Sequence, residues 1–175
     1  AGSGQLGIEA LSRGAQNAVF IDNSKKSLDV VKRNLSATRF EDRAKVISTD
    51  YMSYLSMTPD RFDIVFIDPP YSTGLLEAAL QSVPRVMSDY GIILCEHPIE
   101  EVLPQQVGSF NLHKVYKFGN LVIIFVVAFG LTQRLALDTL LLTRGWCLAG
   151  VESNIYGSLY AVDKDVTILA LNLGR

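Results

Sequence analysis

FDIVFIDPPY, residues 62–71, joins an apolar strand to a short, rigid turn and decides how the chain folds. Phe62–Ile67 is short and almost wholly apolar, which is typical of a buried strand in a parallel sheet. Asp68-Pro69-Pro70-Tyr71 follows it directly and combines an acid, two prolines and an aromatic ring. Because ligands in open α/β sheets bind at the carboxyl ends of strands, this turn predicts a small polar pocket there.

Helices and strands alternate on both sides of this stretch. Before it we expect helices at 5–12, 24–35 and 51–56, and strands at 18–22 and 44–48. After it we expect a helix at 75–87 that Pro84 kinks or shortens, a strand at 91–95, and a hairpin of strands at 110–116 and 121–127. This alternation predicts an α/β, Rossmann-like fold with a mostly parallel sheet and a C-terminal antiparallel hairpin.

The two ends of the chain depart from this pattern. Residues 1–7 already form a glycine-rich turn, and such turns normally follow a strand. We therefore expect the first strand to be missing and two inner strand edges to be exposed. We assign residues 1–127 to a partial domain and 128–175 to an extension of unknown role, in which 131–142 fits a helix and 166–173 a strand.

Composition limits the classes of function. The net charge is −2, so the surface as a whole does not attract polyanions, and any nucleic-acid contact must be local. Cys95 and Cys147 lack the spacing of a metal site and are too few for a disulfide framework, which favours a reducing, cytoplasmic location. No apolar run is long enough to predict a membrane span.

The N-terminal turn, Gly2-Ser3-Gly4-Gln5-Leu6-Gly7, matches the pattern G-x-G-x-x-G, and Asp22 lies 20 residues after Gly2. Glycines let the backbone approach a ligand closely, and an acid at the next strand end can accept hydrogen bonds from ribose hydroxyls. The loop thus predicts an adenosine-containing cofactor and leaves S-adenosylmethionine (SAM) and NAD both open. For Asp22 the alternative is a helix-capping role beside Asn23 and Ser24.

Asp50 follows the strand at 44–48 in the same way. Its carboxylate there can accept a hydrogen bond from the exocyclic amine of adenine, with Tyr51 or Met52 packed nearby. A solvated loop aspartate is the alternative, and the sequence favours neither. His97, after the strand at 91–95, is interpreted as a loop histidine, with a place on the pocket rim as the alternative.

The Asp-Pro-Pro-Tyr turn favours SAM over NAD. The exocyclic amine of a base is a poor nucleophile because its lone pair is delocalised into the ring. The Asp68 carboxylate and the Pro69 carbonyl can each hold one amine hydrogen, which favours a pyramidal nitrogen, while Tyr71 stacks on the base. No metal is needed for this chemistry. Whether Asp68 takes the proton or only orients the amine stays open.

Three blocks of sequence resemble one family, the bacterial 16S ribosomal RNA (guanine(966)-N(2))-methyltransferases. The blocks are AGSGQLGIEALSRGA at 1–15, VFIDN at 19–23 and DPPY at 68–71, and KVYKFGN at 114–120 resembles the closing hairpin. The resemblance covers about residues 1–127. It implies a class I fold that is truncated at its N-terminus and lacks the family's basic N-terminal region.

The resemblance also implies site residues and partners. Those implied at the cofactor are Ala1, Gly2, Ser3, Gly4, Asp22, Asn23, Asp50 and Tyr51; those implied at the target base are Asp68, Pro69, Pro70 and Tyr71. The implied enzyme transfers a methyl group from SAM to a guanine N2 in 16S rRNA or the assembling 30S subunit. Separately, we expect a monomer. The alternatives are adenine-N6 methylation, a truncated fragment without activity, and an NAD-dependent oxidoreductase.

Overall fold

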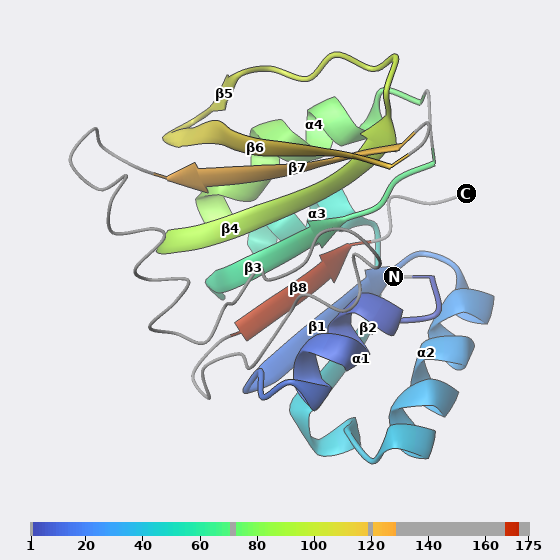
Figure 1. Ribbon diagram of the computed structural model, residues 1–175. Helices are drawn as coiled ribbons and strands as arrows, with labels where there is room; N and C mark the ends of the chain where they lie inside the picture. The colour runs from blue at the N-terminus through green and yellow to red at the C-terminus, as the bar shows by residue number, and fades with distance from the viewer. Residues whose placement is uncertain (1, 71–72, 119–120, 129–166, 172–175) are drawn as a thin grey trace.

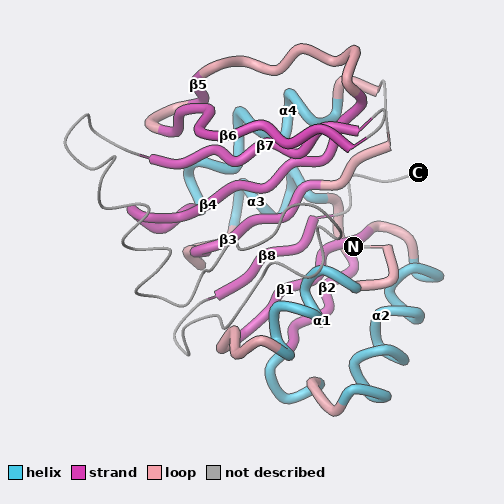
Figure 2. Tube along the Cα trace, viewed as in Figure 1, coloured by secondary structure: helices cyan, strands magenta, loops and turns pink. Residues whose placement is uncertain are grey.

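The computed structural model describes residues 2–70, 73–118, 121–128 and 167–171. Their strands form one sheet in the order β2-β1-β8-β3-β4-β7-β6-β5 (Figures 1 and 2). Helices α1 and α2 cover one face of the sheet, and α3 and α4 cover the other. The predicted α/β, Rossmann-like architecture is confirmed, with β2, β1, β8, β3 and β4 parallel and β7 and β6 antiparallel.

The elements agree closely with those predicted between residues 5 and 128. The helices are α1 (Gln5–Ser12), α2 (Lys25–Thr38), α3 (Tyr51–Met57) and α4 (Leu75–Ser82), with 3-10 turns η1 (Glu41–Arg43) and η2 (Val83–Val86). The strands are β1 (Asn17–Asp22), β2 (Ala44–Ser48), β3 (Phe62–Ile67), β4 (Met87–Pro98), β5 (Gln106–Val107), β6 (Phe110–Phe118), β7 (Leu121–Ala128) and β8 (Thr167–Leu171).

Local sequence explains where these helices begin and end. Ser24 caps α2, and its hydroxyl accepts a hydrogen bond from the N–H of Ser27 at 3.4 Å. The helix ends at Arg39, whose φ of 60° is left-handed. α4 stops at Ser82 and continues as η2, because the ring of Pro84 clashes with the carbonyl four residues before it. The predicted helix at 131–142 lies outside the described residues.

The strand between β1 and β3 comes from the C-terminal extension. β8 is parallel to both neighbours, with Ile21 of β1 and Ile67 of β3 opposite Leu171. The strand predicted at 166–173 is thus confirmed. The expectation of two exposed inner edges is wrong for the described sheet, because the backbone of β8 pairs with β1 on one side and β3 on the other.

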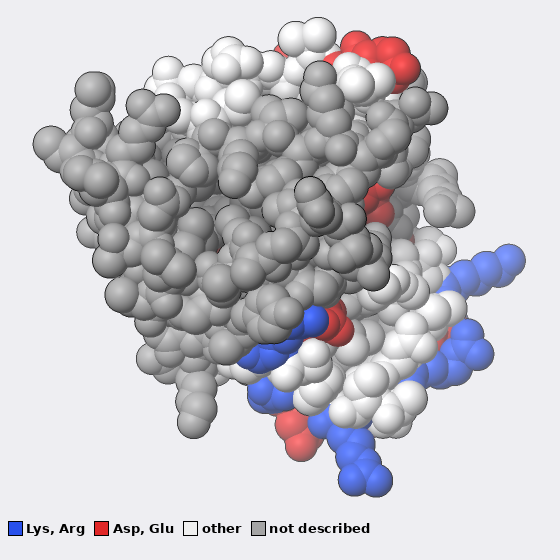
Figure 3. Space-filling view, viewed as in Figure 1, with Lys and Arg blue, Asp and Glu red and all other residues white. Residues whose placement is uncertain are grey.

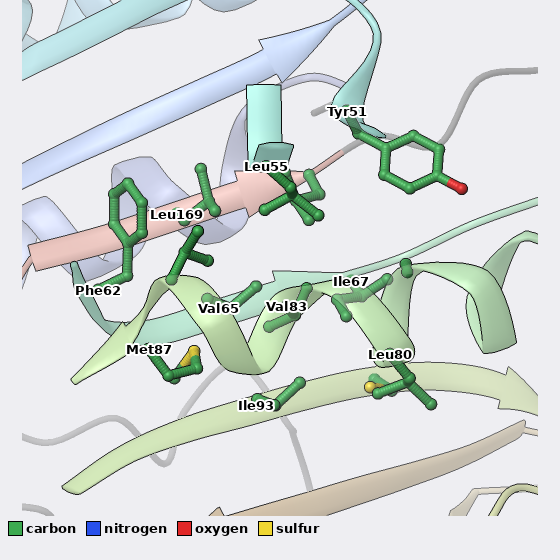
Figure 4. Packing of buried hydrophobic residues seen from close by; sticks show 14 of the residues in the cluster. Tyr51, Leu55, Phe62, Val65, Ile67, Leu80, Val83, Met87, Ile93 and Leu169 are labelled. Atoms are coloured by element: carbon green, nitrogen blue, oxygen red, sulfur yellow. The ribbon is translucent and has the colours of Figure 1, made fainter. Parts of the chain in front are cut away.

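The hydrophobic core has two layers, one on each face of the sheet. The layer under α3 and α4 includes Tyr51, Leu55, Val65, Leu80 and Leu169 (Figure 4). The layer under α1 and α2 includes residues of β1, β3 and β8, namely Phe20, Ile64, Phe66, Ile168 and Ala170. Successive residues of β8 therefore point into opposite layers, as expected for a strand buried on both faces.

β4 and its histidine differ from what the sequence predicts. β4 runs from Met87 to Pro98, seven residues longer than the predicted strand at 91–95, and His97 lies within it opposite Val122 of β7. The interpretation of His97 as a loop residue is wrong, because it lies within β4 and its side chain is buried at 3% exposure. Its alternative place on the pocket rim stays a prediction. Among the described residues, no helix combines the length and apolarity needed to span a bilayer.

Candidate functional site

The predicted site residues gather at one edge of the sheet, which we call the carboxyl edge. It is formed by the ends of the parallel strands: Asp22 ends β1, Asp50 follows β2, and Asp68 follows β3. β8 ends at Leu171, between Ile21 and Ile67. The glycine turn precedes α1, and a Cβ on Gly4 would lie 3.3 Å from Cε1 of Phe20, two residues before Asp22 in β1. In an open parallel sheet this edge is where a ligand binds.

The glycine turn has the backbone geometry of a ligand-binding loop. Gly2 and Gly4 have φ values of 53° and 78°, in the left-handed region that favours glycine. A Cβ on Gly4 would lie 3.2 Å from Val31 Cγ1, whereas a Cβ on Gly2 would meet nothing within 4 Å. The Asn34 side-chain amide donates to the Ser3 carbonyl at 2.8 Å and ties the turn to α2. The turn is therefore fixed on one side and open at Gly2.

The third glycine of the motif, Gly7, serves packing. A Cβ on Gly7 would lie 2.5 Å from Phe20 Cε1 and 2.7 Å from Phe20 Cζ. Both residues are buried, so the ring of Phe20 fills the space that any larger side chain in α1 would need. In motifs of this kind the last glycine is expected to allow the helix to pack closely against the strand, here α1 against β1.

Asp22 is fully buried at the end of β1. Its Oδ1 accepts a hydrogen bond from the N–H of Ser24 at 2.7 Å, which closes the turn into α2. The N-cap of that helix is Ser24, not Asp22. The carboxylate is thus held in place at the carboxyl edge by its own turn, while Asn23 beside it is exposed.

Asp50 and Tyr51 have clear structural roles. Asp50 is exposed and caps α3, accepting hydrogen bonds from the N–H groups of Met52 at 2.9 Å and Ser53 at 3.4 Å. Tyr51 packs at the margin of the core layer in Figure 4, with its hydroxyl directed away from the other labelled side chains. Burial, and secondarily the charge of Asp50, raises the pKa of the Tyr51 hydroxyl. Cofactor contacts of both residues stay predictions.

The Asp-Pro-Pro turn is anchored by the start of the next helix. Asp68 is exposed, Pro69 is buried and Pro70 is half-buried. The Thr73 hydroxyl donates to the Pro70 carbonyl at 2.8 Å and accepts from the Leu75 N–H at 3.4 Å, which joins the turn to α4. The turn therefore presents a carboxylate at the carboxyl edge from a rigid backbone. Tyr71 and Ala1, the remaining predicted site residues, lie outside the described residues.

Residues 1–127 match the protein family described as "Conserved hypothetical protein 95". The chain belongs to this family. It is 35% identical over 136 residues to ribosomal RNA small subunit methyltransferase D of Escherichia coli, and the match covers 77% of this chain and 65% of that protein. It is 36% identical over 124 residues to YlbH of Bacillus subtilis, whose name describes it as a candidate rRNA methyltransferase, covering 68% of this chain and 67% of YlbH.

A solved structure supports the same assignment. The Escherichia coli protein yhhF, described as a candidate methyltransferase, is 31% identical and superimposes with a TM-score of 0.66 over 73% of this chain and 71% of that one. The family and the methyltransferase fold predicted from the sequence are therefore confirmed. The match spans about two thirds of the length of these two curated relatives.

The family's match ends at residue 127, so it does not reach β8. The sequence predicts this strand but not its place between β1 and β3. It also does not predict the role of Asp63, whose Oδ2 accepts from the Thr167 N–H at 2.9 Å and whose Oδ1 accepts from the Ser88 hydroxyl at 2.7 Å. No local sequence pattern predicts these hydrogen bonds, because Asp63, Thr167 and Ser88 lie on three different strands.

Basic side chains near the sheet are described to different extents. Arg13 donates from Nε to Glu9 at 2.7 Å. The side chains of Lys114 and Lys117 lie outside the described part. Exposed lysines and arginines, including those of α2, gather at the lower right of Figure 3. Among the residues described, no group of three His, Cys, Asp or Glu side chains could hold a metal ion.

Proposed function

We propose that this family member uses SAM to methylate the exocyclic N2 amine of a guanine in 16S rRNA. The single observation that carries the proposal is the placement of the open glycine turn, buried Asp22 and the Asp68-Pro69-Pro70 turn at one edge of the sheet. The first two suit an adenosine cofactor, and the third suits an amine-bearing base. The names of the relatives support an rRNA substrate.

The residues at the carboxyl edge are suited to binding SAM. Gly2 and Gly4 give room for close backbone approach, and the carboxylate of Asp22 is placed to accept hydrogen bonds from ribose hydroxyls. Ser3, held through its carbonyl by Asn34, completes the loop. Bound there, SAM supplies an electrophilic methyl group on its sulfonium.

The residues of the turn after β3 prepare the amine. The Asp68 carboxylate and the Pro69 carbonyl each accept one amine hydrogen, which opposes delocalisation of the nitrogen lone pair into the ring. Because Pro69 is buried and the Pro70 carbonyl is bonded to Thr73, little ordering is needed when the base binds. As the amine gains a methyl group it becomes positively charged, and the Asp68 carboxylate stabilises that charge before a proton leaves to solvent.

The proposed substrate is the 16S rRNA or the assembling 30S subunit, and the proposed enzyme acts as a cytoplasmic monomer. The exposed lysines at the start of α2, Lys25 and Lys26, follow the turn that holds Asp22 and are suited to phosphate contacts near the site.

Methyl transfer to 30S subunits that lack the mark tests the proposal. Tritiated SAM is the donor, and the labelled nucleoside is identified after digestion of the rRNA. We expect N2-methylguanosine as the product and a loss of about a hundredfold or more in rate for Asp68→Ala. Asp89→Ala is the matched control, because Asp89 is an exposed acid near the amino end of β4, away from the carboxyl edge.

Three results would contradict this function. N6-methyladenosine as the labelled product would favour the adenine alternative. Full activity of Asp68→Ala would show that the turn after β3 does not act on the base. Binding of NAD without binding of S-adenosylhomocysteine, the product form of the cofactor, would favour an oxidoreductase.

A further inference from the structure

β8 occupies the centre of the proposed site. Leu171, its last residue, lies opposite Ile21 on one side and Ile67 on the other. The residues that follow these two neighbours are Asp22 and Asp68. The C-terminal strand therefore ends between the proposed ribose ligand and the proposed base-binding turn, although the family's match stops at residue 127.

The position of β8 sets the spacing of the site. Neighbouring strands lie about 4.8 Å apart, so one strand inserted between β1 and β3 holds them roughly 10 Å apart. If β1 and β3 paired directly, Asp22 and Asp68 would approach to about one strand spacing. If no strand lay between them, β1 and β3 would each have an unpaired edge. No hydrogen bonds would then hold the two strands at a fixed distance from one another.

Several contacts hold β8 in register. Ile168 and Ala170 pack with Ala10 and Leu11 of α1, the helix that follows the glycine turn. On the opposite face, Leu169 and Leu171 are both buried in the layer under α3 and α4. At the amino end of the strand, the Thr167 N–H donates to Asp63 at 2.9 Å. Both the cofactor loop and the base-binding turn are thus built on elements that contact β8.

We propose that docking of the C-terminal strand β8 between β1 and β3 builds the methyl-donor site, so that the strand and the cofactor stabilise each other's binding. The proposal rests on the proposed function only for the identity of the cofactor as SAM. A ligand that binds only the docked state shifts the docking equilibrium toward that state. S-adenosylhomocysteine should therefore protect β8, and β8 should be required for its binding.

Disulfide trapping in the full chain tests where β8 docks. Asn17 and Thr167 are opposite one another at the amino ends of β1 and β8, so Asn17→Cys with Thr167→Cys should form a bridge. Cys147→Ser removes the native thiol outside the described part, and buried Cys95 is retained. The matched control is Lys45→Cys with Thr167→Cys. Lys45 lies on β2, two strand spacings from β8, which exceeds the reach of a disulfide.

We expect the bridge in the first variant and not in the control, with an S-adenosylhomocysteine affinity in the bridged chain within about twofold of the parent. Equal bridging in the two variants, or no bridge in either, would overturn the placement of β8. A bridged chain that had lost the affinity of the parent would overturn the role of β8 in the site.

Hydrogen exchange of the full chain tests the coupling. At a hundredfold excess of S-adenosylhomocysteine over its Kd, amides of β8 should exchange up to about a hundredfold more slowly, because their opening requires release of the ligand. Amides of β6, far from the site in the sheet order, serve as the control and should change little. Unchanged exchange in β8 at saturation would refute the coupling.

These measurements distinguish failure of this inference from failure of the proposed function. Neither needs rRNA, so a different target nucleotide would leave both expected results in place. A parent chain that binds no S-adenosylhomocysteine would overturn the inference together with the proposed cofactor.

Discussion

The carboxylate of Asp63 accepts a hydrogen bond from the backbone N–H of Thr167 at 2.9 Å, across 104 residues of sequence. Its second oxygen accepts from the Ser88 hydroxyl at 2.7 Å. One side chain of β3 thus fixes the beginning of β8 and the beginning of β4, its neighbours on either side. The contact lies at the amino end of the sheet, opposite the proposed site, so its loss should affect stability more directly than chemistry.

Asp63→Ala should lower the free energy of unfolding by about 1–3 kcal/mol, because it leaves the part-buried N–H of Thr167 without its acceptor. Asp63→Asn is the matched control. Its amide oxygen can accept from Thr167 while its NH2 group donates to the Ser88 hydroxyl, so the loss should be smaller. Urea unfolding followed by circular dichroism measures both. Equal stability of the alanine variant and the parent would show that the contact contributes nothing.

The fold and the site were predictable to different degrees. β3 and its Asp-Pro-Pro turn follow from local signals, a short apolar run and two prolines, and the cap at Ser24 follows from one hydroxyl before a helix. The place of β8 could not be found in this way. Periodicity identifies a strand over 167–171, but its neighbours are chosen by pairing with residues about a hundred or more positions away.

The roles of individual side chains also depend on tertiary contacts that local sequence does not reveal. An aspartate at the end of a strand looks the same in sequence at residues 22 and 50. In the structure, Asp22 is fully buried at the carboxyl edge, whereas Asp50 is exposed and caps α3. His97 was misplaced because β4 extends past residue 95 to pair with β7, a tertiary contact that no local pattern indicates.

Gly7→Ala should destabilise the protein although alanine is the better helix former. The new methyl group would lie 2.5 Å from the ring of buried Phe20, and overpacking of this kind costs about 1–3 kcal/mol. Combining it with Phe20→Leu, which shortens the opposing side chain, should cost less than the sum of the two single changes. Thermal unfolding of the four proteins measures the coupling, and strict additivity would show that the two residues do not compete for space.

Asp22→Asn should weaken binding of S-adenosylhomocysteine about tenfold or more while leaving the fold intact. The asparagine oxygen can still accept from the Ser24 N–H, so the turn into α2 is kept, but the negative charge that strengthens hydrogen bonds from ribose hydroxyls is lost. Calorimetric titration gives the affinity, and the thermal midpoint checks the fold. An affinity equal to that of the parent would mean that Asp22 serves only the turn.

Cys95 should make stability depend on pH in the alkaline range. Burial raises the pKa of its thiol far above the usual value, so the folded chain keeps the proton that the unfolded chain loses above about pH 8.5. The stability linked to this group is therefore fully present below that pH and decreases as the pH rises above it. Raised pKa values of Tyr51 and Tyr54 act in the same direction at higher pH, so Cys95→Ala is needed to isolate the thiol. Between pH 8 and pH 9.5, the thermal midpoint of the parent should fall more steeply than that of Cys95→Ala, and parallel curves would show that the thiol titrates alike in both states.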